Sequence, residues 1–341
     1  MRISQYLELP KKMHDARTKS GMSQKYIADK MGITKQSYSR YENGVAEPSI
    51  ETLEVFCKEV NMTIPELLGL SVVTNHFEKS FFEKTIAFWH SKNIQTEDEL
   101  ALALNGFDIS FAYHSGSLEN ERITYHDTSE IFKHDSISSY TGDLKTLFEI
   151  INLKKAHELF LKSFQDKLSL NECLLKNFHK CLTHNIYDIR RCKLGECPGE
   201  YKHNDYVTGK NEIGASPEDV AEEIKELLEE LHDVPHDKVL LAAAYFHVKF
   251  ENIHPFADGN GRTGRMAMNY FLVMNGHPPI TIHQEDRMEY YSALKAWDER
   301  QDLDPMHQFL MNQTCNTWKK EVLKQEISLR KLNVKKSDIV L

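Results

Sequence analysis

The chain is poor in cysteine and in long apolar runs, and each scarcity argues against a class of protein. Among 341 residues there are six cysteines, and the only close pair, Cys192 and Cys197, has no histidine at ligand-like spacing. A zinc site and a disulfide scaffold are therefore not expected, and reduced thiols are the simpler interpretation. The N-terminus has no apolar signal segment, and no run approaches the length of a membrane span. We expect a cytoplasmic protein with no membrane partner.

Positive charge is also in short supply. The chain has 42 Lys and Arg against 51 Asp and Glu, a net charge of −9, which argues against general coating of nucleic acid. Strand-like alternation is rare, whereas amphipathic helical periodicity recurs along the chain. Repeats and low-complexity segments are absent. The length suits two or three units, and we expect an all-α (mainly α) fold with one small hairpin.

One polar segment, residues 254–265, carries the densest chemistry in the chain. It reads His-Pro-Phe-Ala-Asp-Gly-Asn-Gly-Arg-Thr-Gly-Arg, and an apolar stretch of helical period follows it from Arg262. The stretch Gly259-Asn260-Gly261 predicts a loop, because glycine accepts positive φ and lets backbone N–H groups face an anion. A helix N-terminus directly after such a loop favours phosphate.

Each side chain of this segment has a chemical use. His254 can take a proton from a hydroxyl, since an imidazole titrates near neutral pH. Asp258 is a hard oxygen ligand that suits Mg²⁺. Arg262 and Arg265 lie three apart on a first helical turn and can fork onto phosphate oxygens. The alternative, a plain turn with a capping Asp and surface arginines, explains fewer of the twelve positions.

These residues resemble the Fic motif, His-x-Phe-x-Asp/Glu-Gly-Asn-Gly-Arg-x-x-Arg, which they match at every defined position. The resemblance implies transfer of AMP from ATP to a Ser, Thr or Tyr hydroxyl of a target protein or of the protein itself, with release of pyrophosphate. It makes His254 the base and Asp258 the ligand of Mg²⁺ or Mn²⁺. It assigns the phosphates to Gly259, Asn260, Gly261, Arg262 and Arg265. Relatives that transfer phosphate carry lysine in place of Gly261, so nucleotidyl transfer is favoured.

Two further segments extend the resemblance. Residues 199–202 and 206–209 read as a hairpin about a polar turn, and the family uses such a flap to align the target segment by strand addition. The flap residues are Tyr201, Lys202, Tyr206 and Val207. Downstream, Tyr290 and Tyr291 lie in an Arg-x-x-Tyr-Tyr-x-x-Leu pattern. They either border the nucleoside or form a packed aromatic pair, and the sequence leaves both alternatives open.

A control element precedes the core. Residues 115–120, Ser-Gly-Ser-Leu-Glu-Asn, fit the inhibitory pattern of the family, Ser/Thr-x-x-x-Glu-Gly/Asn, with Ser115 and Glu119 at its defined positions. The resemblance implies that Glu119 pairs with Arg265 and withholds it from the γ-phosphate, and a buried pair of this kind is costly to break. In some relatives the equivalent glutamate serves to remove AMP from targets. Ordinary helix capping is the alternative explanation of so short a pattern.

The N-terminal stretch, residues 13–68, resembles the Cro/C1-type (XRE-like) helix-turn-helix domain. Ser23 and Thr34 are suited to be N-caps, and Gly32 suits the left-handed residue of the turn. Residues 11–40 hold eight Lys and Arg against two acidic residues, which gives one face positive charge. The resemblance assigns DNA contact to Gln24, Lys35, Gln36, Ser37 and Arg40. Useful specificity requires a dimer on paired half-sites, and contact with protein instead of DNA is the alternative.

We therefore predict four segments. These are a helix-turn-helix domain at 1–70, a helical connector at 71–107, a Fic domain with its inhibitory helix at 108–318, and a helical tail at 319–341. The predicted function is an ATP-dependent protein adenylyltransferase, autoinhibited by Glu119 and able in principle to remove AMP, with a DNA-binding head. A nucleotide-sensing transcription regulator without transferase activity is the alternative. The intact His254 argues against it, because a sensor needs no base.

Overall fold

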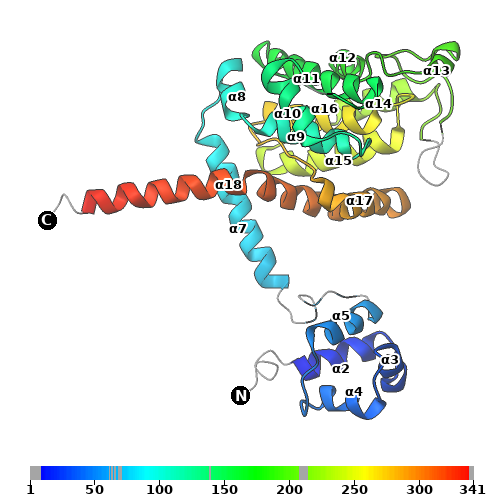
Figure 1. Ribbon diagram of the computed structural model, residues 1–341, viewed down its shortest axis with the longest axis vertical. Helices are drawn as coiled ribbons and strands as arrows, with labels where there is room; N and C mark the ends of the chain where they lie inside the picture. Colours follow the sequence, from blue (N-terminus) through cyan, green and yellow to red (C-terminus); the bar gives the residue numbers. More distant parts are fainter. Residues whose placement is uncertain are drawn as a thin grey trace. The chain divides into compact units, whose positions relative to one another are not determined.

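The computed structural model describes residues 9–60, 62, 64, 67, 71–137, 140–206 and 214–337. For residues 71–79 and 329–337 it describes the backbone alone. Every regular element in these ranges is a helix, which confirms the predicted all-α (mainly α) fold (Figure 1). The chain divides into two compact units, Met1–Ser80 and Phe81–Leu341. No helix in the described ranges has the length and apolar character needed to cross a membrane.

The first unit is a small helical bundle. Its helices are α2 (Leu9–Lys19), α3 (Gln24–Lys30), α4 (Lys35–Glu42) and α5 (Ile50–Glu59). As predicted, the side chains of Ser23 and Thr34 cap α3 and α4 by accepting from the amides of Tyr26 and Ser37. Gly32 has φ +68°, the left-handed conformation expected of it between these two helices. The sequence thus determined both helix starts and the turn between them.

The core of this unit consists of apolar side chains from all four helices and from the segment after α5. Its buried members are Leu9, Met13, Ala16, Ile27, Ala28, Tyr38, Leu53, Phe56, Cys57, Val60 and Leu67. The rings of Tyr38 and Phe56 stack with centroids 6.2 Å apart, which joins α4 to α5. This contact fixes α4, the helix that carries most of the residues predicted to touch DNA.

A buried carboxylate, Glu42, ties the helices of this unit together. Its side chain is 3% exposed and accepts hydrogen bonds from Arg17 Nε at 2.6 Å, Gln24 Nε2 at 2.8 Å and the Tyr38 hydroxyl at 2.9 Å. Burial alone would raise the pKa of Glu42, but these donors, led by Arg17, lower it to about 2. The amide group of Gln24 is therefore engaged within the unit, unlike the exposed Lys35, Gln36 and Arg40.

Replacing Glu42 with Gln should destabilise the first unit by about 3 kcal/mol, because it leaves a largely buried guanidinium without its counter-charge. The folded pKa lies below that of an unfolded Glu, near 4.3, so the stabilisation is present above about pH 4.3 and is lost as the pH falls towards 2. Hydrogen exchange of the α2 to α4 amides in the full chain measures both effects. Glu54→Gln, an exposed change on α5, is the matched control. Equal protection of the two variants would contradict the prediction.

The second unit is a larger assembly of helices, and α7 (Ser71–His90) crosses the division into it. The helices that follow are α8 (Glu97–Ala103), α9 (Phe107–Ser117), α10 (Tyr125–His134), α11 (Leu144–Gln165), α12 (Glu172–Leu182), α13 (Ile189–Lys193), α14 (Val220–Glu229), α15 (Val239–Ile253), α16 (Asn260–Met274), α17 (Arg287–Arg300) and α18 (Asp304–Ser337), with short 3₁₀ turns at His236–Lys238 and Gln284–Asp286. The tail predicted from residue 319 continues α18 without a break.

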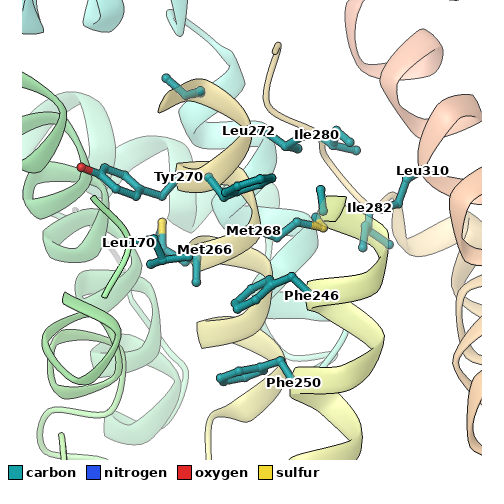
Figure 2. Close-up of a cluster of buried hydrophobic side chains, with 14 of the residues drawn as sticks. Leu170, Phe246, Phe250, Met266, Met268, Tyr270, Leu272, Ile280, Ile282 and Leu310 are labelled. Atoms are coloured by element: carbon teal, nitrogen blue, oxygen red, sulfur yellow. The ribbon is translucent and has the colours of Figure 1, made fainter. Parts of the chain in front are cut away.

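Helix α16 runs through the centre of this unit, and almost all of its residues are buried. Figure 2 shows Phe246 and Phe250 of α15 beside Met266 and Met268 of α16 in a shared apolar cluster. On another side, Tyr270 of α16 packs edge-on against aromatic rings from α11 and α12. A helix that is covered all round has a fixed position. The loop that leads from α15 into α16 is therefore held at both ends by the core.

The predicted hairpin is not formed in the part of it that the structure describes. Residues 199–206 run as turn and irregular chain without strand pairing, and Val207 lies outside the described residues. The reason is that other partners take the polar groups of this segment. The amide of Lys202 donates to the carbonyl of Pro255 at 2.9 Å, and the hydroxyl of Tyr206 donates to Glu196 at 2.8 Å. The segment is fastened to the loop after α15 instead of to a second strand.

Candidate active site

A cavity of about 400 Å³ opens at the N-terminus of α16 and gathers residues that are far apart in the sequence. Ten of the predicted site residues line it. They are Glu119, Tyr206, His254, Asp258, Gly259, Asn260, Gly261, Arg265, Tyr290 and Tyr291. Tyr201 and Lys202 are not part of its wall, and of the predicted flap only Tyr206 reaches it among the described residues.

The loop after α15 has a fixed backbone. His254 caps α15 in the left-handed conformation, with φ +51°, and Gly259 does the same before α16, with φ +78°. The Asn260 side chain spans the loop: its Oδ1 accepts from the Phe256 amide at 2.9 Å, and its Nδ2 donates to the Phe256 carbonyl at 2.7 Å. The side chain of Asn260 thus braces the loop, which leaves its backbone amide to face the cavity.

The first amides of α16 are the feature of this cavity that is suited to an anion. A helix leaves its first N–H groups without intrahelical acceptors. Within the described residues, no carbonyl or side chain accepts from the backbone amides of Asn260, Gly261 or Arg262. Free amides at the positive end of a helix favour a phosphate group. The residues around them give the cavity the donors that a polyphosphate requires.

His254 lies on the cavity wall in its base form. Burial, and then the positive charge of Lys202, lowers the pKa of His254 to about 4. The imidazole is therefore neutral at pH 7 and has a lone pair to accept a proton. His247, on the helix α15 that His254 caps, is fully buried, and its Nε2 lies 2.8 Å from the Tyr290 hydroxyl, so it is a packed histidine and not part of the cavity wall.

Asp258 projects into the same cavity beside two guanidinium groups. Its Oδ1 accepts the Gly259 amide at 2.7 Å and lies 3.7 Å from Arg262 Nη2, and its Oδ2 lies 3.5 Å from Arg191 Nη2. No group of three or more metal-binding side chains occurs in the described part of the chain. One carboxylate beside a phosphate site is nevertheless what Mg²⁺ needs, because substrate phosphates and water complete its shell. The residues present fit a divalent cation bound together with a nucleotide.

Arg265 is locked by the predicted inhibitory segment. Its Nη2 donates to Glu119 Oε1 at 2.9 Å and to the Ser115 carbonyl at 2.9 Å, and its Nε donates to Ser115 Oγ at 3.0 Å. The Arg265 side chain is 3% exposed, whereas Glu119 is 39% exposed and faces the cavity. Burial would raise the pKa of Glu119, but the charge of Arg265, and then that of Arg262, lowers it, so the carboxylate is ionised.

The same glutamate occupies space directly above the phosphate-binding amides. A side chain built at Gly261 would collide with Glu119 Oε1, since the carboxylate sits over the first turn of α16. Glu119 therefore engages Arg265 and also fills the space over the first turn of α16. Below it, Asn120 Nδ2 donates to Glu149 Oε2 at 2.6 Å, which fastens the inhibitory segment to α11.

The two arginines of the motif have different surroundings. Arg262 is 3% exposed and does not line the cavity. Its Nη1 lies 3.5 Å from Glu149 Oε1 of α11, and its Nε is buried with no hydrogen-bond partner among the described residues. Spacing places both arginines on one face of α16, but only Arg265 reaches the cavity in this state. Arg262 contacts the cavity wall through Asp258, whose Oδ1 lies 3.7 Å from its Nη2.

At the far wall, Tyr290 and Tyr291 form the packed aromatic pair that was one of the two alternatives for them, and they line the cavity as well. Their rings pack with centroids 5.3 Å apart, and both line the cavity. Tyr290 is buried and bonded to His247, while Tyr291 is 40% exposed. A rigid aromatic surface next to the phosphate cradle is suited to stack against a nucleoside base.

Two charged residues of the cavity wall were not predicted. Glu251, one helical turn before His254, has its pKa raised to about 7 by burial, and its Oε1 has no hydrogen-bond partner in the described ranges. Its position three residues before the motif was the only available signal. Arg191 comes from α13, which the sequence gave no reason to bring here.

Comparisons with known proteins agree with this geometry. Residues 169–272 match the model of the Fic/DOC family, and residues 13–67 match a helix-turn-helix model. The chain is 28% identical over 228 residues to proteins named protein adenylyltransferase Fic from Drosophila persimilis and Drosophila melanogaster, a match that covers 64% of this chain. It spans 42% and 44% of their respective lengths, less than half of each relative.

Solved structures share the fold. A Fic-domain signaling protein from Bacteroides thetaiotaomicron superposes with a TM-score of 0.60 at 24% identity, covering 71% of this chain and 95% of that one. Fic-1 from C. elegans superposes with a TM-score of 0.61 at 18% identity, covering 93% of this chain and 99% of that one. At these identities the likeness concerns the fold alone.

Proposed function

We propose that this chain, which contains a Fic domain and an N-terminal helix-turn-helix domain, is a protein adenylyltransferase that moves AMP from ATP to a hydroxyl of a target protein. One observation carries the proposal. A neutral imidazole, His254, lies in the same cavity as the unengaged amides that begin α16. A base beside an anion cradle is the equipment for attack by an alcohol on a phosphate.

In the proposed reaction, His254 accepts the proton of the target hydroxyl as that oxygen attacks the α-phosphorus of ATP. A new P–O bond forms to the target, the bond from the α-phosphorus to the bridging oxygen of the β-phosphate breaks, and pyrophosphate leaves. The amides of Asn260 and Gly261 bind the oxygens on which negative charge develops. Asp258 would hold Mg²⁺ or Mn²⁺, which when bound neutralises phosphate charge.

We propose further that the protein is autoinhibited. Support comes from the hydrogen bond of Arg265 to Glu119 and from the position of the Glu119 carboxylate above Gly261. With Glu119 in place, Arg265 is withheld from the outer phosphates and the α-phosphate cannot take its productive position on the amides of α16. Movement of Glu119 away from α16 frees both at once.

The helix-turn-helix unit is the proposed DNA-binding head. Lys35, Gln36 and Arg40 are exposed on α4, whereas Ser37 is half-buried and hydrogen-bonded to the cap Thr34. Gln24 would contact DNA only after releasing Glu42, so its proposed part is smaller. Because one such unit reads few base pairs, we propose that two copies of the chain bind paired half-sites.

Incubation of the purified chain with labelled ATP and Mg²⁺, followed by mass spectrometry of a cell lysate, tests the function. We expect a protein adduct with the mass of an AMP group, weak for the natural chain and stronger for the Glu119→Gly variant. The modified peptide identifies the target and the hydroxyl. If the variant yields no adduct with ATP, CTP, GTP or UTP, the transferase proposal fails. Operator binding that changes with ATP, without any covalent product, would favour a nucleotide-sensing regulator.

A further inference from the structure

Arg191 is held over the cavity by its own helix. Nη1 of Arg191 lies 3.1 Å from Asp188 Oδ2, and the same aspartate caps α13 by accepting the Arg191 amide at 2.8 Å. The guanidinium lies over the Tyr187 ring, 5.9 Å from its centroid. These contacts fix one edge of the guanidinium on the protein. Its Nη2 lies beside Asp258 Oδ2, and both residues line the cavity.

Two other donors of Arg191 have no hydrogen-bond acceptor among the described residues. Nε of Arg191 is buried without a partner in the described chain, and Nη2 makes only the 3.5 Å ion pair with Asp258 Oδ2. A buried donor without an acceptor costs free energy, most of all on a charged group. The arrangement is incomplete as it stands, and a phosphate oxygen that binds Nη2 would give this guanidinium the anion that it lacks.

The other two arginines near the cradle are not available in this way. Arg265 is engaged by Ser115 and Glu119, and Arg262 lies behind the wall next to Glu149. Arg191 lies beside Asp258, and neither Ser115 nor Glu119 is among its hydrogen-bond or ion-pair partners in the described chain. It is therefore open to an anion while Glu119 is still in place.

We propose that Arg191 is a further ligand of the nucleotide, binding oxygens of its polyphosphate on the Asp258 side of the cavity. The inference rests on the proposed nucleotide-binding function of this cavity. It has two consequences. The nucleotide gains a guanidinium contact that does not depend on the release of Arg265, so ATP binds to the inhibited protein as well. When Arg191 binds phosphate, Asp258 loses its ion pair with Arg191 and is free to bind a divalent cation.

Calorimetric titration of the full chain with ATP, and separately with adenosine, tests this role. Arg191→Gln should weaken ATP binding about 10-fold to 100-fold, the range expected for a charged hydrogen bond, and leave adenosine binding unchanged. The ATP affinity of Arg191→Lys should lie between that of the natural chain and that of Arg191→Gln, because lysine keeps the positive charge but not the forked guanidinium. The control is Arg190→Gln, the exposed neighbour on the same helix, which should bind ATP like the natural chain. The same series in a Glu119→Gly background should show the same ratio.

Three results would overturn the inference. Equal ATP affinity of Arg191→Gln and Arg190→Gln would remove Arg191 from the phosphate site. A parallel loss of ATP and adenosine affinity, together with a lower melting temperature of Arg191→Gln, would assign it a structural role only. A chain that binds ATP but transfers no nucleotide would refute only the transferase proposal, because the ATP affinities of Arg191→Gln and Arg190→Gln can still be compared. Absence of ATP binding in both backgrounds would refute both.

Discussion

Replacing His254 with alanine should lower the rate of AMP transfer by about 10² to 10⁴, the usual contribution of a general base. The expected loss is in turnover, since the amides of α16 and the arginines that bind ATP remain. Initial rates with labelled ATP at saturating target give the effect, and calorimetry with ATP shows whether the nucleotide still binds. The background for both measurements is the Glu119→Gly variant, in which transfer is fast enough to quantify.

The matched control for this prediction is His236→Ala, an exposed histidine of the turn before α15, which should leave transfer unchanged. The pH profile adds a second control. An imidazole accepts a proton only when it is unprotonated, and burial lowers the pKa of His254 to about 4. The rate should therefore hold on acidification well below pH 6.5 and fall only as the pH approaches 4. Full activity of His254→Ala would refute its role as base.

Replacing Glu119 with glycine should raise transfer about 10-fold to 100-fold, since it removes one charged hydrogen bond to Arg265 and opens the space above Gly261. Glu119→Gln separates the two causes. It removes the charge but keeps the volume, so we expect an increase smaller than that of glycine. Rates of self-labelling or target labelling at fixed ATP and Mg²⁺ provide the comparison.

A nearby carboxylate supplies the control for Glu119. Glu121, two residues later, is exposed and pairs with Arg287 at 2.8 Å, away from the phosphate cradle. Glu121→Gly should leave transfer near its natural level. If it raises transfer as much as Glu119→Gly does, loosening of the whole inhibitory segment would explain the activation, and competition for Arg265 would not. An unchanged rate in Glu119→Gly, with His254 intact and ATP bound, would refute autoinhibition by this residue.

The spacing of residues along the chain was enough to predict the motif loop and the helix after it. Two glycines around Asn260 require positive φ or close approach, and the apolar period that follows has one stable outcome, a buried helix. The observed helix begins at Asn260, two residues earlier than the periodicity indicated, because Gly259 takes the left-handed capping conformation. In the first unit the caps Ser23 and Thr34 were equally predictable, since capping is a local interaction.

The hairpin illustrates where local patterns stop being sufficient. Residues 199–202 and 206–209 were predicted as two strands of a hairpin, but the Lys202 amide bonds to the carbonyl of Pro255, a partner far away in the sequence. Strand formation depends on such tertiary alternatives more than helix formation does. For the same reason, the sequence did not predict that Glu251 and Arg191 line the cavity.

By itself, the sequence determined which groups this protein has for phosphate chemistry: an imidazole, a carboxylate, a helix start between glycines and two arginines, all within one short segment. Only the tertiary structure decided how they are used. Arg265 and Arg262 are equivalent by helical spacing, yet α9 brings Ser115 and Glu119 to the first while α11 brings Glu149 to the second. Charge interactions depend on distance in space, and packing of helices remote in sequence sets that distance.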